Sequence, residues 1–343
     1  MRVLAGDIGG TKTAIAIFEI EARSLSVGRS QTYASSEFAS LEEILERFLS
    51  SQKSPPRVAG FGVAGPVLAG RAKLTKLDWT VDAGGLSRSV GIPHVRVVND
   101  FVAAALGIPY LKPRHLLTLC SGKQERDGPI GLIGAGTGLG QAALVSLGGH
   151  YEPLPSEGGH ADFGPRNATE DGLVRFVRAK FGRVTLDRLL SGEGLAHVYD
   201  FLKQDGFAHE SPAVSKGFES EDRAAVITRS ALADGDRLCA GALRLFVSLY
   251  GSETGNLALR YRATGGVYVS GGIAPKILPA LREPDFLESF RAKPPLEAFL
   301  AKIPVHVVQE PRLPLFGAAA AAYRMAMEMT RPSSKTMVRA SRR

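Results

Sequence analysis

The sequence has little cysteine: its 343 residues include only Cys120 and Cys239, and no C-x-x-C pair occurs. This scarcity excludes a disulfide framework, and a zinc site built from cysteine pairs, as the organising feature of the fold. Unpaired cysteines suit a reducing compartment, so we expect a cytoplasmic protein.

Long apolar runs are also missing. None approaches the roughly 20 residues that a membrane-spanning helix requires. The first segment contains Asp7 and lacks the basic start and apolar stretch of a signal peptide, so we expect no membrane partner. The hydrophobic share of 44% and the charged share of 22% are typical of a globular protein. The length predicts about two domains.

Acidic residues are absent from residues 331–343, which carry five of the eight net positive charges and leave the rest of the chain at +3. A net charge of that size is ordinary, so we expect no nucleic-acid partner. We predict that residues 330–343 form a disordered, solvated tail, with binding to an acidic partner as the alternative.

The strongest pattern lies near the N-terminus, where residues 4–18 read LAGDIGGTKTAIAIF. Apolar residues run into Asp7, two adjacent glycines follow, and AIAIF predicts a second strand. Adjacent glycines permit positive φ and let backbone N–H groups point to one spot, as in a phosphate cradle. Lys12 lies beside this turn, and a carboxylate near a phosphate usually implies a divalent cation between them. The alternative is an ordinary hairpin turn.

Two better-known phosphate loops do not fit this segment. Thr11 occupies the place of the second glycine in the P-loop pattern G-x-x-x-x-G-K-[ST]. A P-loop or a Rossmann turn also opens a helix, whereas the residues after Thr13 predict a strand. The turn therefore belongs to a β-hairpin.

A second strand–turn–strand unit occurs at residues 129–147, which read PIGLIGAGTGLGQAALVSL. The turn is rich in glycine and threonine, and Leu139 excludes the pattern G-x-G-x-x-G. Two such units about one domain length apart suggest two similar domains that share one nucleotide.

Three further segments carry polar groups suited to a site. Asn99 and Asp100 end a predicted strand (94–98) before a predicted helix (101–106), so Asp100 is either the cap of that helix or a carboxylate at a strand end that accepts a hydroxyl proton. The sequence EGGH at Glu157–His160 lies in a predicted irregular loop (151–167) and suits recognition of adjacent hydroxyls. A glycine pair at 271–272 follows another predicted strand, where either nucleotide binding or helix packing explains it.

With these motifs in order, the chain resembles the bacterial glucokinases of the actin, Hsp70 and sugar-kinase superfamily from residue 3 to about residue 323. The resemblance rests on GDIGGTKT, VVNDF, GAGTGLG, SEGGHADF, LLSGEGL and VYVSGGI. It implies an α/β fold of two ribonuclease-H-like domains flanking a sugar and nucleotide cleft. The implied activity is ATP-dependent phosphorylation of glucose at its C6 hydroxyl.

The resemblance also implies roles for individual residues. Asp100 would be the catalytic base, and it would bind the sugar together with Asn99, Glu157, His160 and Asp187. Asp7 would lie near Mg²⁺ and hold it through water. The residues that would bind ATP are Gly9, Gly10, Thr11, Lys12, Gly136, Thr137, Gly138, Gly271 and Gly272. The family further implies a homodimer.

Three positions depart from the family pattern. Asp187 stands where a sugar-binding glutamate is usual, which retracts the carboxylate by about 1.5 Å, one C–C bond. Lys76, ahead of Trp79, replaces an asparagine. Lys12 resembles the DIGGTK of the repressor/ORF/kinase sugar kinases, but this chain lacks the cysteine-rich zinc motif of that group.

The resemblance predicts a small domain (1–111 with 312–329), a large domain (112–311) and the basic tail (330–343). Two other functions stay open. One is a kinase for another hexose or amino sugar, or one with a different phosphoryl donor. The other is a sugar-binding regulator without catalytic activity. An actin- or Hsp70-like module is disfavoured because such proteins do not need Glu157 and His160.

Overall fold

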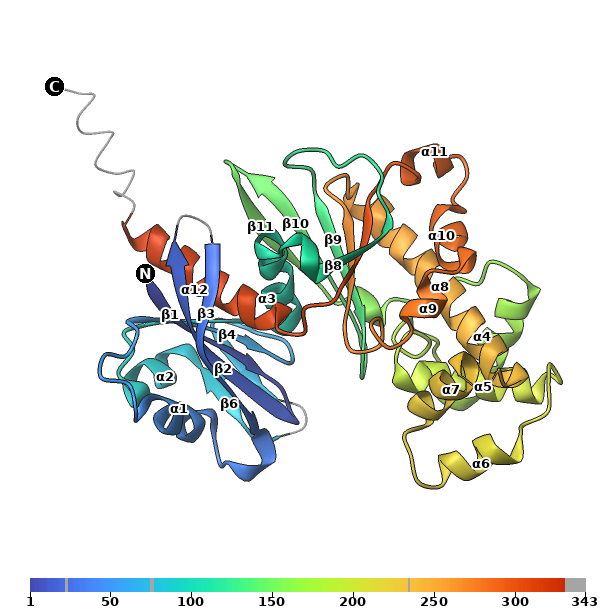
Figure 1. Cartoon of the computed structure of the whole chain (residues 1–343), viewed down its shortest axis with the longest axis horizontal. Coiled ribbons are helices and arrows are strands. Elements are labelled where there is room, and N and C mark those ends of the chain that lie inside the picture. The colour runs from blue at the N-terminus through green and yellow to red at the C-terminus, as the bar shows by residue number, and fades with distance from the viewer. Residues whose placement is uncertain (22–23, 75–76, 234, 331–343) are drawn as a thin grey trace. The chain divides into compact units, whose positions relative to one another are not determined.

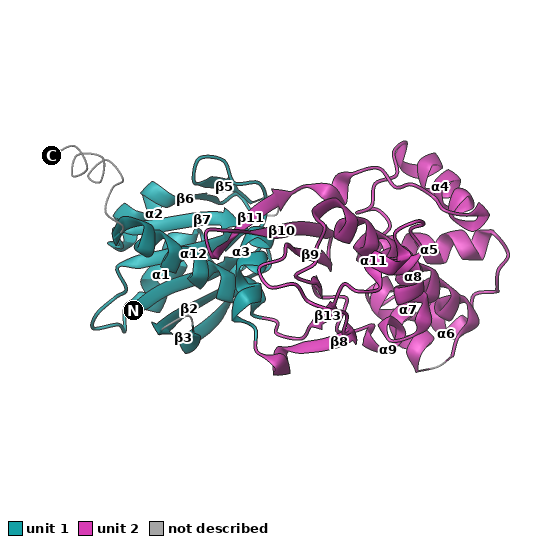
Figure 2. Ribbon diagram, turned by 90° about the horizontal axis from the view of Figure 1, so that it is seen from above, with its two compact units in different colours: residues 1–111, 312–343 teal, residues 112–311 magenta. Residues whose placement is uncertain are grey.

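The computed structural model describes residues 1–21, 24–74, 77–233 and 235–330. The chain divides into two compact units, Met1–Leu111 with Arg312–Arg343 (unit 1) and Lys112–Pro311 (unit 2), coloured teal and magenta in Figure 2. Lys76 and residues 331–343 of the predicted tail lie outside the described residues. No helix within the described ranges has the length and apolar character needed to cross a bilayer.

Unit 1 is built on a five-stranded sheet with the order β3-β2-β1-β4-β7. Its strands are β1 (Arg2–Ile8), β2 (Lys12–Glu21), β3 (Ser24–Ala34), β4 (Val58–Val63) and β7 (His94–Asn99). The same unit contains α1 (Leu41–Leu49), α2 (Ala83–Val90), α3 (Asp100–Gly107), α12 (Leu313–Thr330) and a short hairpin of β5 (Arg71–Lys73) and β6 (Thr80–Asp82).

Unit 2 is built on a six-stranded sheet with the order β11-β10-β9-β12-β13-β8. Its strands are β8 (Leu116–Cys120), β9 (Ile130–Ala135), β10 (Leu139–Leu147), β11 (His150–Ser156), β12 (Val267–Ser270) and β13 (Val305–Val308). Its α-helices are α4 (Ala168–Phe181), α5 (Gly192–Gln204), α6 (Pro212–Phe218), α7 (Arg223–Leu232), α8 (Arg237–Tyr261), α9 (Leu278–Leu281), α10 (Pro284–Arg291) and α11 (Glu297–Leu300).

The two sheets repeat one topology. Each contains an antiparallel hairpin, β1–β2 or β9–β10, extended on one side by a third antiparallel strand, β3 or β11. On the other side lie two parallel strands, β4 and β7 or β12 and β13. This repeat agrees with the predicted pair of similar α/β domains. In each sheet the glycine turn joins the two strands of this hairpin, β1 to β2 and β9 to β10.

The strand β1 shows why the sheet of unit 1 is covered on both faces. Side chains alternate along a strand, so Leu4 and Ile8 pack with Phe48 of α1, whereas Val3 and Ala5 pack against α12. Figure 1 shows α1 and α12 on opposite sides of this sheet. The fixed strands therefore hold the residues at their ends in place.

Small residues allow α12 to lie close to the sheet. An ideal Cβ built on Gly60 of β4 would lie only 2.1 Å from the backbone oxygen of Ala318. The alanines of α12 from Ala318 to Ala322 are buried. The segment from 312 to 330 thus completes the core of the unit that begins the chain.

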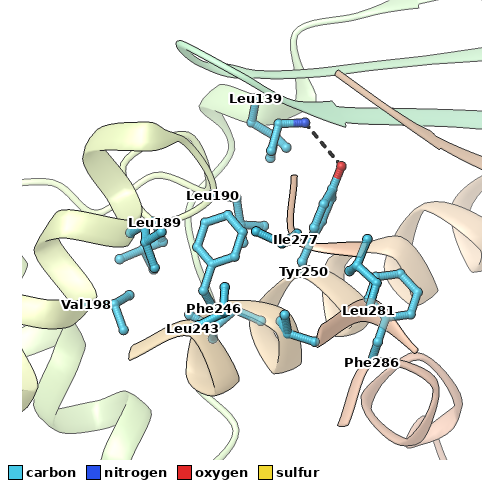
Figure 3. Packing of buried hydrophobic residues seen from close by; sticks show 14 of the residues in the cluster. Leu139, Leu189, Leu190, Val198, Leu243, Phe246, Tyr250, Ile277, Leu281 and Phe286 are labelled. Atoms are coloured by element: carbon cyan, nitrogen blue, oxygen red, sulfur yellow. Dashed lines mark hydrogen bonds between the residues drawn. The ribbon is translucent and has the colours of Figure 1, made fainter. Parts of the chain in front are cut away.

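The core of unit 2 surrounds α8. Phe246 and Tyr250 of this helix lie among Ile277, Leu281 and Phe286 (Figure 3), and all five side chains are buried. This core supports β9 and β12, the two strands that lead into the glycine-rich segments of the unit.

Two secondary-structure predictions were wrong, and one strand was not predicted. The stretch 151–167, predicted to be irregular, begins with the strand β11, which contains Pro153 and Pro155. Proline is tolerated there because β11 is an edge strand and does not need every N–H. The sequence also predicts a helix from Pro275, but the residues there form only the single turn α9. The strand β3 was missed because most of its side chains are exposed and polar, which leaves a weak pattern.

Candidate active site

The parallel strands of unit 1 bring three predicted site residues to one edge of the sheet. Asp7 lies one residue before the end of β1, Asn99 ends β7, and Asp100 is the first residue of α3. In the sheet, Gly62 of the intervening strand β4 pairs with Asp7, and its ideal Cβ would lie 3.7 Å from the Cα of Asp100. The carboxyl ends of parallel strands are where α/β sites collect.

The first glycine turn, Gly9 to Thr11, joins β1 to β2. The Gly9 N–H donates to the Lys12 carbonyl at 3.0 Å, and the Ser35 hydroxyl donates to the Gly9 carbonyl at 2.9 Å. The buried hydroxyls of Thr13 and Ser35 lie 2.9 Å apart and share a hydrogen bond. The side chains of Thr11 and Lys12 are exposed beside the turn.

Adjacent glycines permit positive φ, but neither Gly9 nor Gly10 has one. Space explains Gly9 instead: an ideal Cβ there would lie 3.0 Å from the Lys12 oxygen. The turn is therefore tight through close packing of its backbone.

Asp7 has an unusual protonation equilibrium. Burial raises the pKa of its carboxyl from 3.8 to about 7, and the negative charge of Asp100 adds to this effect. Two neighbouring carboxylates that disfavour each other's ionisation form a site that a cation would stabilise. Among the residues that the structure describes, however, no group of three or more His, Cys, Asp or Glu side chains could hold a metal ion. A divalent cation near Asp7 would therefore take most of its ligands from water and phosphate.

Asn99 caps α3. Its Oδ1 accepts from the N–H groups of Phe101 (2.9 Å) and Val102 (3.2 Å), and its Nδ2 donates to the Gly65 carbonyl at 3.0 Å. The interpretation of Asp100 as the cap of a helix starting at Phe101 was therefore wrong by one residue. Asp100 instead lies in the first turn, where the helix dipole favours a negative charge.

The second glycine turn, which we call the phosphate hairpin (Ala135 to Leu139), joins β9 to β10. Within it, the Gly136 N–H donates to the Gly138 carbonyl at 2.8 Å. Two bonds from one later segment hold it: the Gly192 N–H donates to the Gly136 carbonyl at 2.9 Å, and Asp187 Oδ1 accepts from the Leu139 N–H at 2.6 Å.

The glycine pair after β12 lies against the phosphate hairpin. Gly271 has a φ of +85°, and an ideal Cβ there would lie 2.4 Å from the Ala135 oxygen, so only glycine fits. The Ile273 N–H donates to the same oxygen at 3.2 Å, and an ideal Cβ on Gly136 would lie 4.0 Å from the Gly272 nitrogen. The structure thus brings together two segments that the sequence could only suggest separately.

Tyr250 was not predicted to matter, yet it fixes both segments. Its hydroxyl accepts from the Ala135 N–H at 3.1 Å and donates to the Ser270 carbonyl at 3.4 Å. Burial raises the pKa of this phenol, which therefore stays neutral at physiological pH. A tyrosine in an apolar helix gave no sequence signal for this role, because its partners come from distant strands.

The loop that we call the sugar loop (Glu157 to His160) contains a short 3-10 helix. The His160 N–H donates to the Glu157 carbonyl at 2.9 Å, and the Gly159 carbonyl accepts from the Asp187 N–H at 2.7 Å. An ideal Cβ on Gly159 would lie 2.0 Å from the Leu139 oxygen, so the loop packs directly against the first residue of β10.

A buried polar network supports the sugar loop from β10 and α8. Gln141 Nε2 donates to Glu253 Oε1 at 2.8 Å, and both side chains are at most 2% exposed. Arg260 and Asn256 also donate to the Glu253 carboxylate, each at 2.8 Å. An ideal Cβ on Gly158 would lie 2.4 Å from Gln141 Oε1. No local sequence pattern indicates this network.

Each predicted site residue in the described ranges therefore falls into one of two groups. In unit 1, Asp7, the first glycine turn, Asn99 and Asp100 meet at one sheet edge. In unit 2, the phosphate hairpin, the sugar loop, Asp187 and the pair 271–272 are joined by the contacts above.

A family model described as Glucokinase matches residues 4–325. A glucokinase from Nostoc punctiforme is 41% identical over 338 residues, which cover 94% of this chain and 99% of that protein. A glucokinase from a Synechocystis species is 37% identical, covering 93% of this chain and 97% of that protein. The crystal structure of a glucokinase from an Antarctic psychrotroph superposes with a TM-score of 0.82 at 29% identity, covering 94% and 99% of the two chains. A ROK family glucokinase from Streptomyces griseus, solved with glucose and AMPPNP, shares the fold with a TM-score of 0.62 at 21% identity, covering 94% and 100%.

Proposed function

The chain belongs to the glucokinase family, and from this premise we propose that it is an enzyme that transfers the terminal phosphoryl group of ATP to the C6 hydroxyl of glucose. One observation of the chain's own structure carries the proposal. Two sheets of the same topology each present a glycine turn, and each turn has polar groups suited to the reaction beside it.

Asp100 is the catalytic base in this proposal. Phosphoryl transfer passes through a loose transition state that demands little basicity, so a carboxylate can act mainly by orienting the hydroxyl and accepting its proton late. Two features support Asp100 in that role: its place in the first turn of α3, and the cap that Asn99 gives this helix.

Asp7 is the residue we assign to Mg²⁺, through water. The raised pKa of its carboxyl, caused by burial and by Asp100, fits a position that a divalent cation would stabilise in the ionised form. Bound Mg²⁺ would neutralise charge on the phosphoryl oxygens. The chain's own contribution is to hold Asp7 at the end of β1 beside the first glycine turn.

Sugar recognition is assigned to Asn99, Glu157 and His160. Asn99 uses one amide N–H for the Gly65 carbonyl, and the amide carries a second N–H for a sugar hydroxyl. Glu157 and His160 are held on the short helix of the sugar loop. Asp187 Oδ1 accepts from the Leu139 N–H, and its other carboxylate oxygen is the one we assign to a sugar hydroxyl.

ATP binding is assigned to backbone groups of the two glycine turns and of the pair after β12. Gly272 supports this because a Cβ there would meet nothing within 4 Å, which leaves its backbone open to a ligand. The residues that we propose line the phosphates or adenosine are Gly9, Gly10, Thr11, Lys12, Gly136, Thr137, Gly138, Gly271 and Gly272.

We further propose a cytoplasmic homodimer that supplies glucose 6-phosphate to glycolysis. The scarcity of cysteine supports the compartment, and the two cysteines are free and buried. The family resemblance supports the dimer, which size-exclusion chromatography with light scattering would test.

The test of function is a sugar panel with Mg-ATP, followed by the same assay on Asp100→Asn. We expect glucose to be the best substrate, and we expect the variant to lose at least about 100-fold in kcat while it still binds glucose. A better rate with another hexose or an amino sugar would favour the alternative kinase. Glucose binding without turnover of any sugar would favour the non-catalytic regulator.

A further inference from the structure

Asp187 contacts the phosphate hairpin and the sugar loop at once. Its side-chain Oδ1 accepts from the Leu139 N–H at 2.6 Å, and its backbone N–H donates to the Gly159 carbonyl at 2.7 Å. Asp187 therefore joins the segment assigned to ATP phosphates to the segment assigned to sugar hydroxyls.

The space around the carboxylate is fitted to aspartate. An ideal Cβ on Gly138 would lie 2.6 Å from Asp187 Oδ1, so the hairpin approaches the oxygen closely only because residue 138 is glycine. One more methylene would extend the carboxylate by about 1.5 Å. A glutamate could not keep this bond unless the hairpin or the segment of residue 187 moved.

The neighbouring bonds make the connection rigid. The Leu186 N–H donates to the Ala161 carbonyl at 3.0 Å, directly after the sugar loop, and the Gly192 N–H donates to the Gly136 carbonyl at 2.9 Å, inside the phosphate hairpin. Residues 186–192 thus form a bracket between the two segments. The carboxylate of Asp187 is the side-chain contact of this bracket with the hairpin.

We propose that Asp187 is a positioning residue that couples the phosphate hairpin to the sugar loop, in addition to any contact of its other oxygen with the sugar. This inference rests on the proposed function. A nucleotide that orders the hairpin also orders the sugar loop through Asp187, and the two substrates strengthen each other's binding by the same factor.

The proposal is tested by titrating AMPPNP into the full chain without sugar, using isothermal calorimetry. Removal of a charge-assisted hydrogen bond to the hairpin in Asp187→Ala should weaken AMPPNP binding by roughly 10-fold. Asp187→Asn keeps an oxygen that can accept from the Leu139 N–H, so its AMPPNP affinity should stay within roughly threefold of the wild type. Repeating both titrations with saturating glucose should show that the mutual enhancement persists in Asp187→Asn and is weakened in Asp187→Ala, which keeps only the backbone bonds of residues 186–192.

Asp171→Asn is the matched control, because Asp171 is an exposed aspartate in the first turn of α4 of the same unit. Unchanged AMPPNP affinity in Asp187→Ala, with a loss confined to glucose, would make Asp187 a plain sugar ligand and overturn the proposal. If Asp187→Ala does not fold, Asp187→Asn still tests the proposal. A folded Asp187→Asn that shows no measurable AMPPNP binding would also overturn it. Failure of the wild type to bind AMPPNP or glucose would instead refute the proposed function.

Discussion

The carboxyl of Asp7 should lower the stability of the protein above neutral pH. Its pKa rises from 3.8 to about 7 on folding, and each unit corresponds to about 1.4 kcal/mol. The upper limit of the cost is therefore about 4 kcal/mol at pH values above 7. Asp7→Asn, which resembles the protonated acid in shape, should recover most of this free energy of unfolding.

The direction of the pH dependence follows from proton binding. Between pH 4 and 7 the folded state holds a proton on Asp7 that the unfolded state has lost, so the free energy of unfolding falls as the pH rises through this window. Near pH 4 Asp7 is protonated in the folded state and about half protonated in the unfolded state, so the wild type and Asp7→Asn should differ by less than about 1 kcal/mol. Above pH 7 the difference should be largest.

The assay is urea unfolding followed by the fluorescence of Trp79, the only tryptophan, which is buried in unit 1 together with Asp7. Asp78→Asn, at a side chain that is 96% exposed, is the control and should follow the wild-type pH dependence because it keeps Asp7. Asp100→Asn should make the wild-type loss smaller and complete it at a lower pH, because it removes the second cause of the raised pKa of Asp7 in the folded state. A stability difference between wild type and Asp7→Asn that is constant with pH would refute the reasoning.

Three other variants test the packing that supports the site. Gly60→Ala should destabilise unit 1 by at least about 2 kcal/mol in urea unfolding, because its Cβ meets the Ala318 oxygen at 2.1 Å; Gly164→Ala, where nothing lies within 4 Å, should be neutral. Tyr250→Phe leaves the Ala135 N–H without its partner and should raise the KM for ATP more than that for glucose, and equal changes would contradict its role in the nucleotide segments. Glu253→Ala leaves buried donors unpaired and should lower the free energy of unfolding by about 3 kcal/mol in calorimetric melting. A decrease below about 0.5 kcal/mol would contradict this expectation.

Local patterns predicted the parts of the fold that depend on neighbouring residues. Ser40 and Glu43 form a capping-box pattern that predicts a helix over residues 40–50, and the structure shows the Ser40 hydroxyl accepting from the Glu43 N–H at the start of α1. Both glycine turns were predicted as hairpins because short β-branched runs flank them, and each joins two antiparallel strands. The assignment to the glucokinase family was confirmed by the match over residues 4–325.

Contacts between distant segments could not be predicted in this way. The bond from Leu139 to Asp187 spans 48 residues, that from Ala135 to Tyr250 spans 115, and that from Gln141 to Glu253 spans 112. No local periodicity encodes such pairs, because they depend on how whole elements pack. The roles of the individual site residues remain predictions that the experiments above address.

The position of α12 has a consequence for synthesis on the ribosome. Residues 312–330 cover the sheet of unit 1, but the ribosome makes them after all 200 residues of Lys112–Pro311. Until then Val3, Ala5 and Phe18 lack the helix α12 over them, whereas the whole of unit 2 has already been synthesised. The first strands of the chain thus wait longest for their partner, and a nascent protein stalled before residue 312 should expose that apolar face to chaperones.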